Sequence, residues 1–282
     1  ILPLGNAQIN LALRSTYSYL CYQKIVMERQ RPLIFVTNDD GIDAPGLKAL
    51  IDAVGEMGDV MAVAPNGPRS GQSSAITVGI PLRIKRHEEY NGVPMYSVSG
   101  TPVDCVKLGM HAVVDRQPSL VLAGINHGSN SGNSVIYSGT MGAVMEGCML
   151  GIPSIGFSLT HHSWAADFAA GLPLVREITG RVLEKGLPDG ICLNVNIPAR
   201  CEPRGVKVCK AAPGRWTEEY KDYVDPTGEP FYFLTGKYIP VNPDDPSTDL
   251  YQLDRGYVSI VPVRPDQTAN DVIGTVENLF LG

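Results

Sequence analysis

The chain has 282 residues, of which 44% are hydrophobic and 18% charged, and its formal net charge is −6. These values are typical of a globular protein and exclude a disordered or fibrous chain. An acidic chain has no overall basic field to collect nucleic acid, and no apolar run approaches the roughly 18 residues of a membrane span. We therefore expect neither a nucleic-acid polymer nor a membrane as partner.

The N-terminal segment is set apart from the rest. Polar residues such as Asn6 and Arg14 interrupt it, so it lacks the apolar stretch of a signal peptide. We expect residues 1–26 to be a tag or other non-native extension, with a short native helix over 9–20 as the alternative. The rest, 27–282, is then a single α/β domain.

From residue 33 onward, strand-like and helix-like segments alternate. In chain order the pattern predicts a strand at 33–37, a helix at 45–57, a strand at 60–64, a β-hairpin within 76–98, a helix at 103–114, a strand at 119–123, a helix at 141–150 and a strand at 154–157. Such alternation requires crossover connections, which predicts a mostly parallel sheet with helices on both faces.

Beyond residue 190 the character changes. Strands are predicted at 192–197, 206–210, 231–234 and 257–263, and proline-rich loops separate them. We expect an α/β core at 33–185 and a β-rich C-terminal extension at 190–282 that packs on the core or exchanges with another subunit. The six cysteines contain no CxxC pair, which fits a reducing cytoplasm better than a disulfide framework or a zinc ribbon.

Oxygen-bearing side chains and glycines follow three of the predicted strands. The segments are NDDG at 38–41, PNGPRSGQSS at 65–74 and GINHGSNSGN at 124–133. Ligands of open parallel sheets bind outside the carboxyl ends of the strands. We therefore expect a ligand site where these three segments meet.

The adjacent carboxylates of Asp39 and Asp40 are the strongest candidates within that site. Paired carboxylates with hydroxyl and amide oxygens nearby suit Mg²⁺, Mn²⁺ or Ca²⁺ rather than zinc. Alone, one aspartate would more often cap the next helix while the other lies in a turn. The hydroxyls of Ser70, Ser73 and Ser74 and the amide of Asn126 supply further oxygens, and this convergence favours a cation site. The lone His127 is a weak candidate for a general acid.

A second feature is Ser138-Gly139-Thr140 at the start of the helix predicted at 141–150. Free N–H groups and the helix dipole favour an anion there, although a simple serine or threonine cap is the commoner role. Ser99-Gly100-Thr101-Pro102 has the same form, and its proline favours capping. The chain has no P-loop, no GxGxxG and no GxSxG motif, and no DxD spacing to support an aspartyl-phosphate mechanism.

Several segments together resemble the SurE family (survival protein E) of metal-dependent nucleotidases and phosphatases. They are TNDDGIDAPG (37–46), RSGQSSAIT (69–77), SGTPVDCV (99–106), AGINHGSNSG (123–132), YSGTMGAVMEG (137–147), LNVNIP (193–198) and TDLYQLDRGYVSIVPV (248–263). The resemblance covers most of residues 33–263, in the expected order.

The resemblance implies a Rossmann-like core, a homodimer or homotetramer, and one divalent cation per subunit. The cation would be Mg²⁺ or Mn²⁺, with Ca²⁺ able to occupy the site, and its ligands would be Asp39, Asp40, Ser70 and Asn126. Naming Ser70 rather than Ser73 depends on the resemblance alone. The implied reaction is hydrolysis of nucleoside 5′- or 3′-monophosphates, with polyphosphate as a further substrate of some members.

For the mechanism, we expect Asp39 or Asp40 to accept a proton from the attacking water, with a preference for Asp39 that the residues themselves do not decide. Asn130, Ser138, Gly139 and Thr140 would hold the phosphate oxygens. A noncatalytic nucleotide- or metal-binding module is the alternative function, and a phospho-aspartate phosphatase is a second alternative that the missing DxD spacing disfavours.

Overall fold

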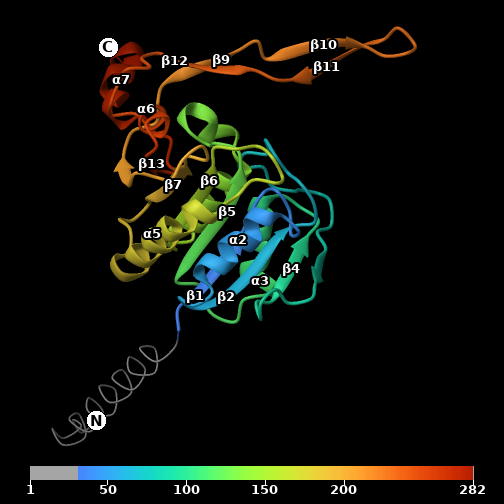
Figure 1. Ribbon diagram of the computed structural model, residues 1–282. Helices are drawn as coiled ribbons and strands as arrows, with labels where there is room; N and C mark the ends of the chain where they lie inside the picture. Colours follow the sequence, from blue (N-terminus) through green and yellow to red (C-terminus); the bar gives the residue numbers. More distant parts are fainter. Residues whose placement is uncertain (1–30, 282) are drawn as a thin grey trace, which may run out of the picture.

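The computed structural model describes residues 31–281 (Figure 1). The expected extension at 1–26 lies outside the described residues. Nine strands form the main sheet, in the order β3-β4-β2-β1-β5-β6-β7-β13-β8. They are β1 (Leu33–Thr37), β2 (Asp59–Pro65), β3 (Ile84–Arg86), β4 (Met95–Val98), β5 (Leu120–His127), β6 (Ser154–Leu159), β7 (Cys192–Ile197), β8 (Val206–Val208) and β13 (Val258–Val263).

The sheet is mostly parallel, as expected from the alternating pattern. Every neighbouring pair from β4 across to β7 is parallel, while β3 and β13 run antiparallel to β4 and β7. The helices are α2 (Pro45–Val54), α3 (Pro102–Ala112), α4 (Gly139–Met149), α5 (Leu172–Lys185), α6 (Asp249–Asp254) and α7 (Ile273–Leu281), with short 3₁₀ turns η1 (Gly132–Tyr137), η2 (Ala169–Gly171) and η3 (Asn270–Val272).

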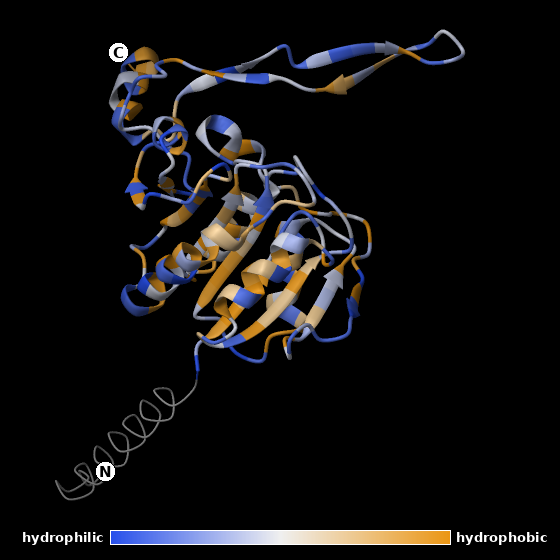
Figure 2. Cartoon of the chain, viewed as in Figure 1, coloured by the Kyte–Doolittle hydropathy of each residue, from blue (hydrophilic) through white to orange (hydrophobic). Residues whose placement is uncertain are grey.

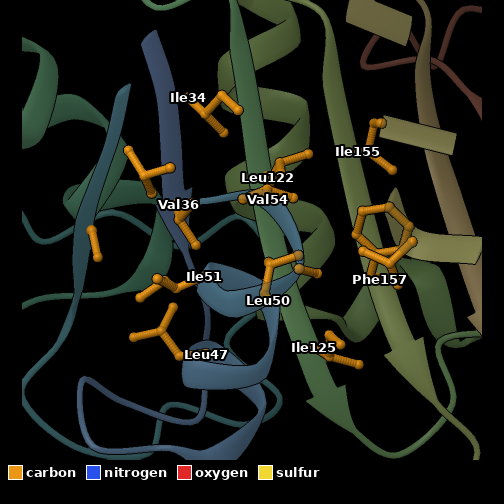
Figure 3. Packing of buried hydrophobic residues seen from close by; sticks show 14 of the residues in the cluster. Ile34, Val36, Leu47, Leu50, Ile51, Val54, Leu122, Ile125, Ile155 and Phe157 are labelled. Atoms are coloured by element: carbon orange, nitrogen blue, oxygen red, sulfur yellow. The ribbon is translucent and has the colours of Figure 1, made fainter. Parts of the chain in front are cut away.

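Strand β1 illustrates how the core is built on both faces of the sheet. Successive side chains of a strand point to opposite faces. Ile34 and Val36 therefore lie in one apolar cluster with residues of α2 (Figure 3), a cluster that α5 also joins, whereas Phe35 packs in a second cluster with α3 and α4. A strand covered on both faces is apolar throughout, which explains the continuous run at 33–36. Burying a leucine such as Leu47 of α2 contributes roughly 1.5–3 kcal/mol.

One expectation about the strands is wrong. The β-hairpin within 76–98 exists, but its first strand is only Ile84–Arg86, and Ile76, Val78 and Ile80 are exposed loop residues. Their alternation has no partner strand to pair with, so periodicity alone did not make a strand. Strands β7, β13 and β8 belong to the same sheet as the strands of segment 33–185, so the C-terminal segment extends the sheet of the core.

The segment 214–240 leaves the sheet as a two-stranded arm. β9 (Gly214–Thr217) pairs with β12 (Lys237–Pro240), and β10 (Tyr220–Val224) pairs with β11 (Pro230–Leu234). The arm extends well away from the sheet, and hydrophobic residues lie along it and on α7 without cover from the described chain (Figures 1 and 2). Only β11 of these strands was expected from the sequence.

Helix α3 begins with the cap expected from Thr101 and Pro102. The Thr101 hydroxyl accepts a hydrogen bond from the Asp104 N–H at 3.1 Å, and Asp104 Oδ2 accepts one from the Thr101 N–H at 2.8 Å. The Thr77 hydroxyl also donates to Asp104 Oδ2, at 2.6 Å. Burial by itself raises the pKa of Asp104, but the hydrogen bonds from Thr77 and Thr101 outweigh it, so the pKa lies below its ordinary value.

We expect Asp104→Ala to lower the free energy of unfolding by roughly 2–3 kcal/mol at pH 7, because it removes a cap and leaves buried donors unpaired. Asp115→Ala, at an exposed aspartate just after α3, is the matched control and should change it by less than about 0.5 kcal/mol. Since the folded pKa of Asp104 is lowered, its contribution is present above the ordinary pKa and is lost as the pH falls through the folded value. Urea unfolding measures both variants, and equal midpoints would contradict the expectation.

Candidate functional site

The hydrogen bonds within the turn after β1 are made by Asn38 and Gly41, and the side chains of the two aspartates between them take no part in these bonds. Asn38 Nδ2 donates to the Gly41 carbonyl at 2.9 Å, and the Gly41 N–H donates to Asn38 Oδ1 at 3.1 Å. Gly41 has φ of +106°, and a Cβ there would lie 3.1 Å from the Gly67 backbone. Helix α2 has Ala44 at its N-cap and no side-chain cap. Neither aspartate caps α2, so the alternative that one of them serves as a helix cap is wrong.

Asp39 is 4% exposed and lies against the N-terminus of α4. The Thr140 hydroxyl donates to Asp39 Oδ1 at 2.5 Å, and a Cβ on Gly139 would lie 2.9 Å from the Asp39 Cβ. Burial raises the pKa of Asp39 to about 6; the Thr140 hydrogen bond opposes this rise and the neighbouring Asp40 charge adds to it. The positive end of the α4 dipole therefore faces a carboxylate that is costly to ionise.

Asp40 is also buried, and it is held by a different segment. Its Oδ2 accepts a hydrogen bond from the His127 backbone N–H at 3.1 Å. Burial raises the pKa of Asp40, and the interactions with His127 oppose the rise. The carboxylate is thereby joined to the residue that follows Asn126 at the end of β5.

The loop after β2 reaches the same place. The Arg69 N–H donates to the Asp39 carbonyl at 2.7 Å, which places the neighbouring Ser70 beside the aspartate turn with an exposed side chain. The Ser73 hydroxyl instead donates to the Ile136 carbonyl at 2.6 Å. The Ser73 hydroxyl is therefore engaged by the Ile136 carbonyl, and the Ser70 hydroxyl does not take part in this hydrogen bond.

Asn126 is half-buried, and its amide nitrogen is engaged. Nδ2 donates to the Gly128 carbonyl at 2.7 Å, an orientation that leaves Oδ1 to accept from or coordinate another group. The backbone contacts of Asp39, Asp40 and their neighbours thus bring together the segments that carry all four predicted metal ligands.

The donor set fits a hard divalent cation. Two buried carboxylates with raised pKa values are stabilised by a positive charge, and hydroxyl and amide oxygens are neutral ligands of the type that Mg²⁺, Mn²⁺ and Ca²⁺ accept. Across residues 31–281 no group of three or more His, Cys, Asp and Glu side chains could hold a metal ion.

The residues predicted to bind phosphate differ in which hydrogen-bonding groups are not already engaged within the protein. The Ser138 hydroxyl accepts from the Met141 N–H at 3.0 Å and so caps α4, the commoner role considered for it. The Thr140 hydroxyl is committed to Asp39. What Gly139 and Thr140 can still offer an anion is the helix N-terminus itself rather than hydroxyl groups.

Asn130 lies in a buried polar network that sequence reasoning did not identify. Its Nδ2 donates to Ser158 Oγ at 2.8 Å, its N–H donates to Asn196 Oδ1 at 2.8 Å, and its carbonyl accepts from Asn194 Nδ2 at 2.8 Å. Asn194 and Asn196 alternate with apolar residues in β7. Buried amides in an otherwise apolar strand were the signal that could have pointed to them.

Fold and site together define an α/β protein with a candidate divalent-cation site at the carboxyl edge of a parallel sheet. A family model described as Survival protein SurE matches residues 34–218. The 5′-nucleotidase SurE of Phocaeicola vulgatus is 46% identical over 252 residues, covering 89% of this chain and 98% of that protein. The 5′-nucleotidase SurE of Bacteroides fragilis is 47% identical over 243 residues, covering 86% of this chain and 95% of that protein.

Among solved structures, the crystal structure of the SurE protein from Aquifex aeolicus superimposes on this chain with a TM-score of 0.76 at 35% sequence identity. The match covers 88% of this chain and 99% of the Aquifex chain. The chain belongs to the SurE family. The resemblance inferred from the sequence motifs is confirmed, as is the α/β fold.

We expect Asp39→Asn to stabilise the metal-free protein at neutral pH. The folded pKa of about 6 exceeds the ordinary 3.8, so the stability contribution of Asp39 falls as the pH rises from 3.8 to 6 and stays low above 6. Asparagine has no charge to bury. In the presence of a chelator, the variant should unfold about 5 °C above the parent chain at pH 7.5.

The difference in unfolding temperature between Asp39→Asn and the parent chain should shrink as the pH is lowered from 7.5 to 5. Differential scanning calorimetry at several pH values measures it. Added Mn²⁺ should raise the unfolding temperature of the parent chain and have little effect on Asp39→Asn. A difference in unfolding temperature that does not change with pH would show that the buried charge of Asp39 is not its cause.

Proposed function

We propose that this protein is a divalent-metal-dependent phosphomonoesterase that hydrolyses nucleoside 5′-monophosphates to nucleoside and phosphate, with 3′-monophosphates and polyphosphate as further candidate substrates. The observation that carries the proposal is the buried pair Asp39 and Asp40, joined by hydrogen bonds to the segments of Ser70, Asn126 and α4. The family relationship supports it, because relatives identical at 46% and 47% are named 5′-nucleotidases.

One divalent cation per subunit, Mg²⁺ or Mn²⁺, would be held by Asp39, Asp40, Ser70 and Asn126, and Ca²⁺ could occupy the same site. When bound, such an ion supplies Lewis-acid chemistry: it polarises the phosphoryl group and acidifies water. The protein contributes two buried, oriented carboxylates, since Thr140 and His127 each bind one oxygen of a carboxylate and leave the other oxygen for the ion or for a proton.

The remaining chemistry falls to residues around the pair. Asp39 or Asp40 accepts the proton of the attacking water, and the hydrogen bonds do not favour one over the other, because each carboxylate has one oxygen engaged. The N-terminus of α4 at Gly139 and Thr140 stabilises charge on the phosphate oxygens, together with the second Nδ2 hydrogen of Asn130, whose first is donated to Ser158, and Ser138 maintains the helix end.

Asp40→Asn should lower phosphate release from AMP at least about 100-fold, since one charged ligand and one proton acceptor are lost. Asp43→Asn, three residues further along the same loop and exposed, is the matched control and should retain the parental rate. Chelator should abolish release by the parent chain, and Mg²⁺ or Mn²⁺ should restore it.

A colorimetric phosphate assay with circular dichroism of each variant measures these outcomes. Near-parental activity of a folded Asp40→Asn would remove Asp40 from the mechanism. Nucleotide binding with no phosphate release by the parent chain at any metal concentration would favour the noncatalytic binding module instead.

We also propose that the chain assembles as a homodimer or homotetramer through the arm and α7. Phe233 of the arm is 59% exposed, and Leu279 and Phe280 of α7 are 75% and 80% exposed. Contiguous exposed apolar residues on projecting elements are typical of subunit interfaces. A cytoplasmic location is proposed because the five cysteines of residues 31–281 are unpaired; in those residues no helix is long and apolar enough to cross a membrane.

Phe280→Asp should weaken assembly, because a charge would have to be buried in an apolar contact. Light scattering of the parent chain should give two or four times 30.3 kDa, and the variant should give a lower mass at the same concentration. Glu277→Gln, on the same exposed helix, is the control and should not change the mass. A parent chain that is monomeric at micromolar concentration would contradict the proposal.

A further inference from the structure

Aromatic side chains form a stack next to the aspartate pair. The indole of Trp164 lies nearly parallel to the imidazole of His127, with ring centroids 5.2 Å apart and 14° between the planes. The ring of Phe168 meets the same imidazole edge-on, also at 5.2 Å. Phe168 is buried in the core, so the stack leads from the core through His127 to Trp164 at the surface.

The middle of this stack is fixed to the candidate site. His127 follows Asn126 directly, and its backbone N–H donates to Asp40 Oδ2. Its ring is held by a contact of 2.9 Å between Nδ1 and the Ser163 carbonyl, in which Nδ1 is the donor because a carbonyl can only accept. The position of the indole is therefore set by a residue that also contacts a predicted metal-binding carboxylate.

The loop that carries Trp164 packs closely on the end of β5. The loop follows β6, whose parallel pairing with β5 puts both carboxyl ends at one edge of the sheet. Gly128 has φ of +120°, and a Cβ there would lie 2.5 Å from the His162 ring, so only glycine lets the loop approach this closely. Trp164 is thus held in place at the edge where the aspartates lie.

One face of the Trp164 indole is covered by His127, yet the side chain remains 53% exposed. Folding alone does not require a large aromatic ring to be held rigidly with so much of its surface in water. A fixed, exposed π-face is suited to a flat aromatic ligand, and nucleobases stack on such rings with little dependence on base identity.

We propose that the exposed face of Trp164 is the stacking platform for the nucleobase of the substrate, with the phosphate directed to the N-terminus of α4 beside Asp39. This inference rests on the proposed nucleotidase function and names the part of the site that selects nucleotides from other phosphomonoesters. It follows that the enzyme accepts different bases with similar efficiency but prefers any of them to a substrate without a base.

The first test compares AMP with ribose 5-phosphate, which has the same phosphate ester and no base. Trp164→Leu removes the aromatic face and keeps an apolar side chain, whereas Trp164→Phe retains a ring. The leucine variant should raise KM for AMP about tenfold with kcat changed less than about twofold, and should leave ribose 5-phosphate kinetics unchanged. The phenylalanine variant should stay closer to the parent chain.

A second test needs neither metal nor turnover. Adenosine added in the presence of chelator should quench the tryptophan fluorescence of the parent chain in a saturable manner. It should not quench that of Trp164→Leu, in which Trp216 remains as the internal reference. Ribose should have no effect on either chain.

The outcomes separate this inference from the proposed function. If the parent chain hydrolyses AMP but Trp164→Leu changes AMP and ribose 5-phosphate kinetics equally, or changes neither, the stacking platform is wrong and the nucleotidase function stands. The absence of adenosine quenching in an active parent chain would equally overturn it. A parent chain that releases phosphate from neither substrate contradicts the proposed function itself.

Discussion

The carboxylates of Asp39 and Asp40 lie buried next to each other, and each is held by a hydrogen bond from a different segment. Burial and mutual repulsion raise the pKa of Asp39 to about 6, although the Thr140 hydroxyl and the N-terminus of α4 oppose the rise. The arrangement is therefore unfavourable for two anions and favourable for anions that share a cation. The close approach of Gly139 to Asp39 and the hydrogen bond from the Thr140 hydroxyl hold one of these two buried carboxylates in place.

Parallel strand order is what allows these segments to meet. β1 lies between β2 and β5, so the chain that leaves each of these strands emerges at one edge of the sheet. The Arg69 and His127 N–H groups then bind the aspartate turn from either side. The same edge receives the loop after β6, which carries Trp164. Substrate recognition by stacking and metal binding by carboxylates would thus depend on one topological feature.

Much of the fold could be predicted from sequence because apolar runs such as 33–36 are diagnostic of strands buried on both faces. The alternation at 76–82 misled for a physical reason, since a strand also requires a neighbour to bond, and the chain offers none there. The arm at 214–240 was largely missed, because its strands pair only with each other and none of them is buried in the core. Pairing of β7 with β13 likewise depends on contacts between distant residues.

Three properties followed from the sequence alone: the chain is α/β, it is similar to the SurE family, and oxygen-bearing side chains follow three strands. It could not decide which hydroxyls are free, because that depends on partners far away in the chain: Ser138 caps a helix, Ser73 binds the Ile136 carbonyl and Thr140 binds Asp39. Nor could it reveal that His127, a weak candidate acid when considered alone, supports the ring of Trp164. Local patterns encode secondary structure and motifs, whereas hydrogen-bond partners and stacked rings exist only after the sheet has brought its strand ends together.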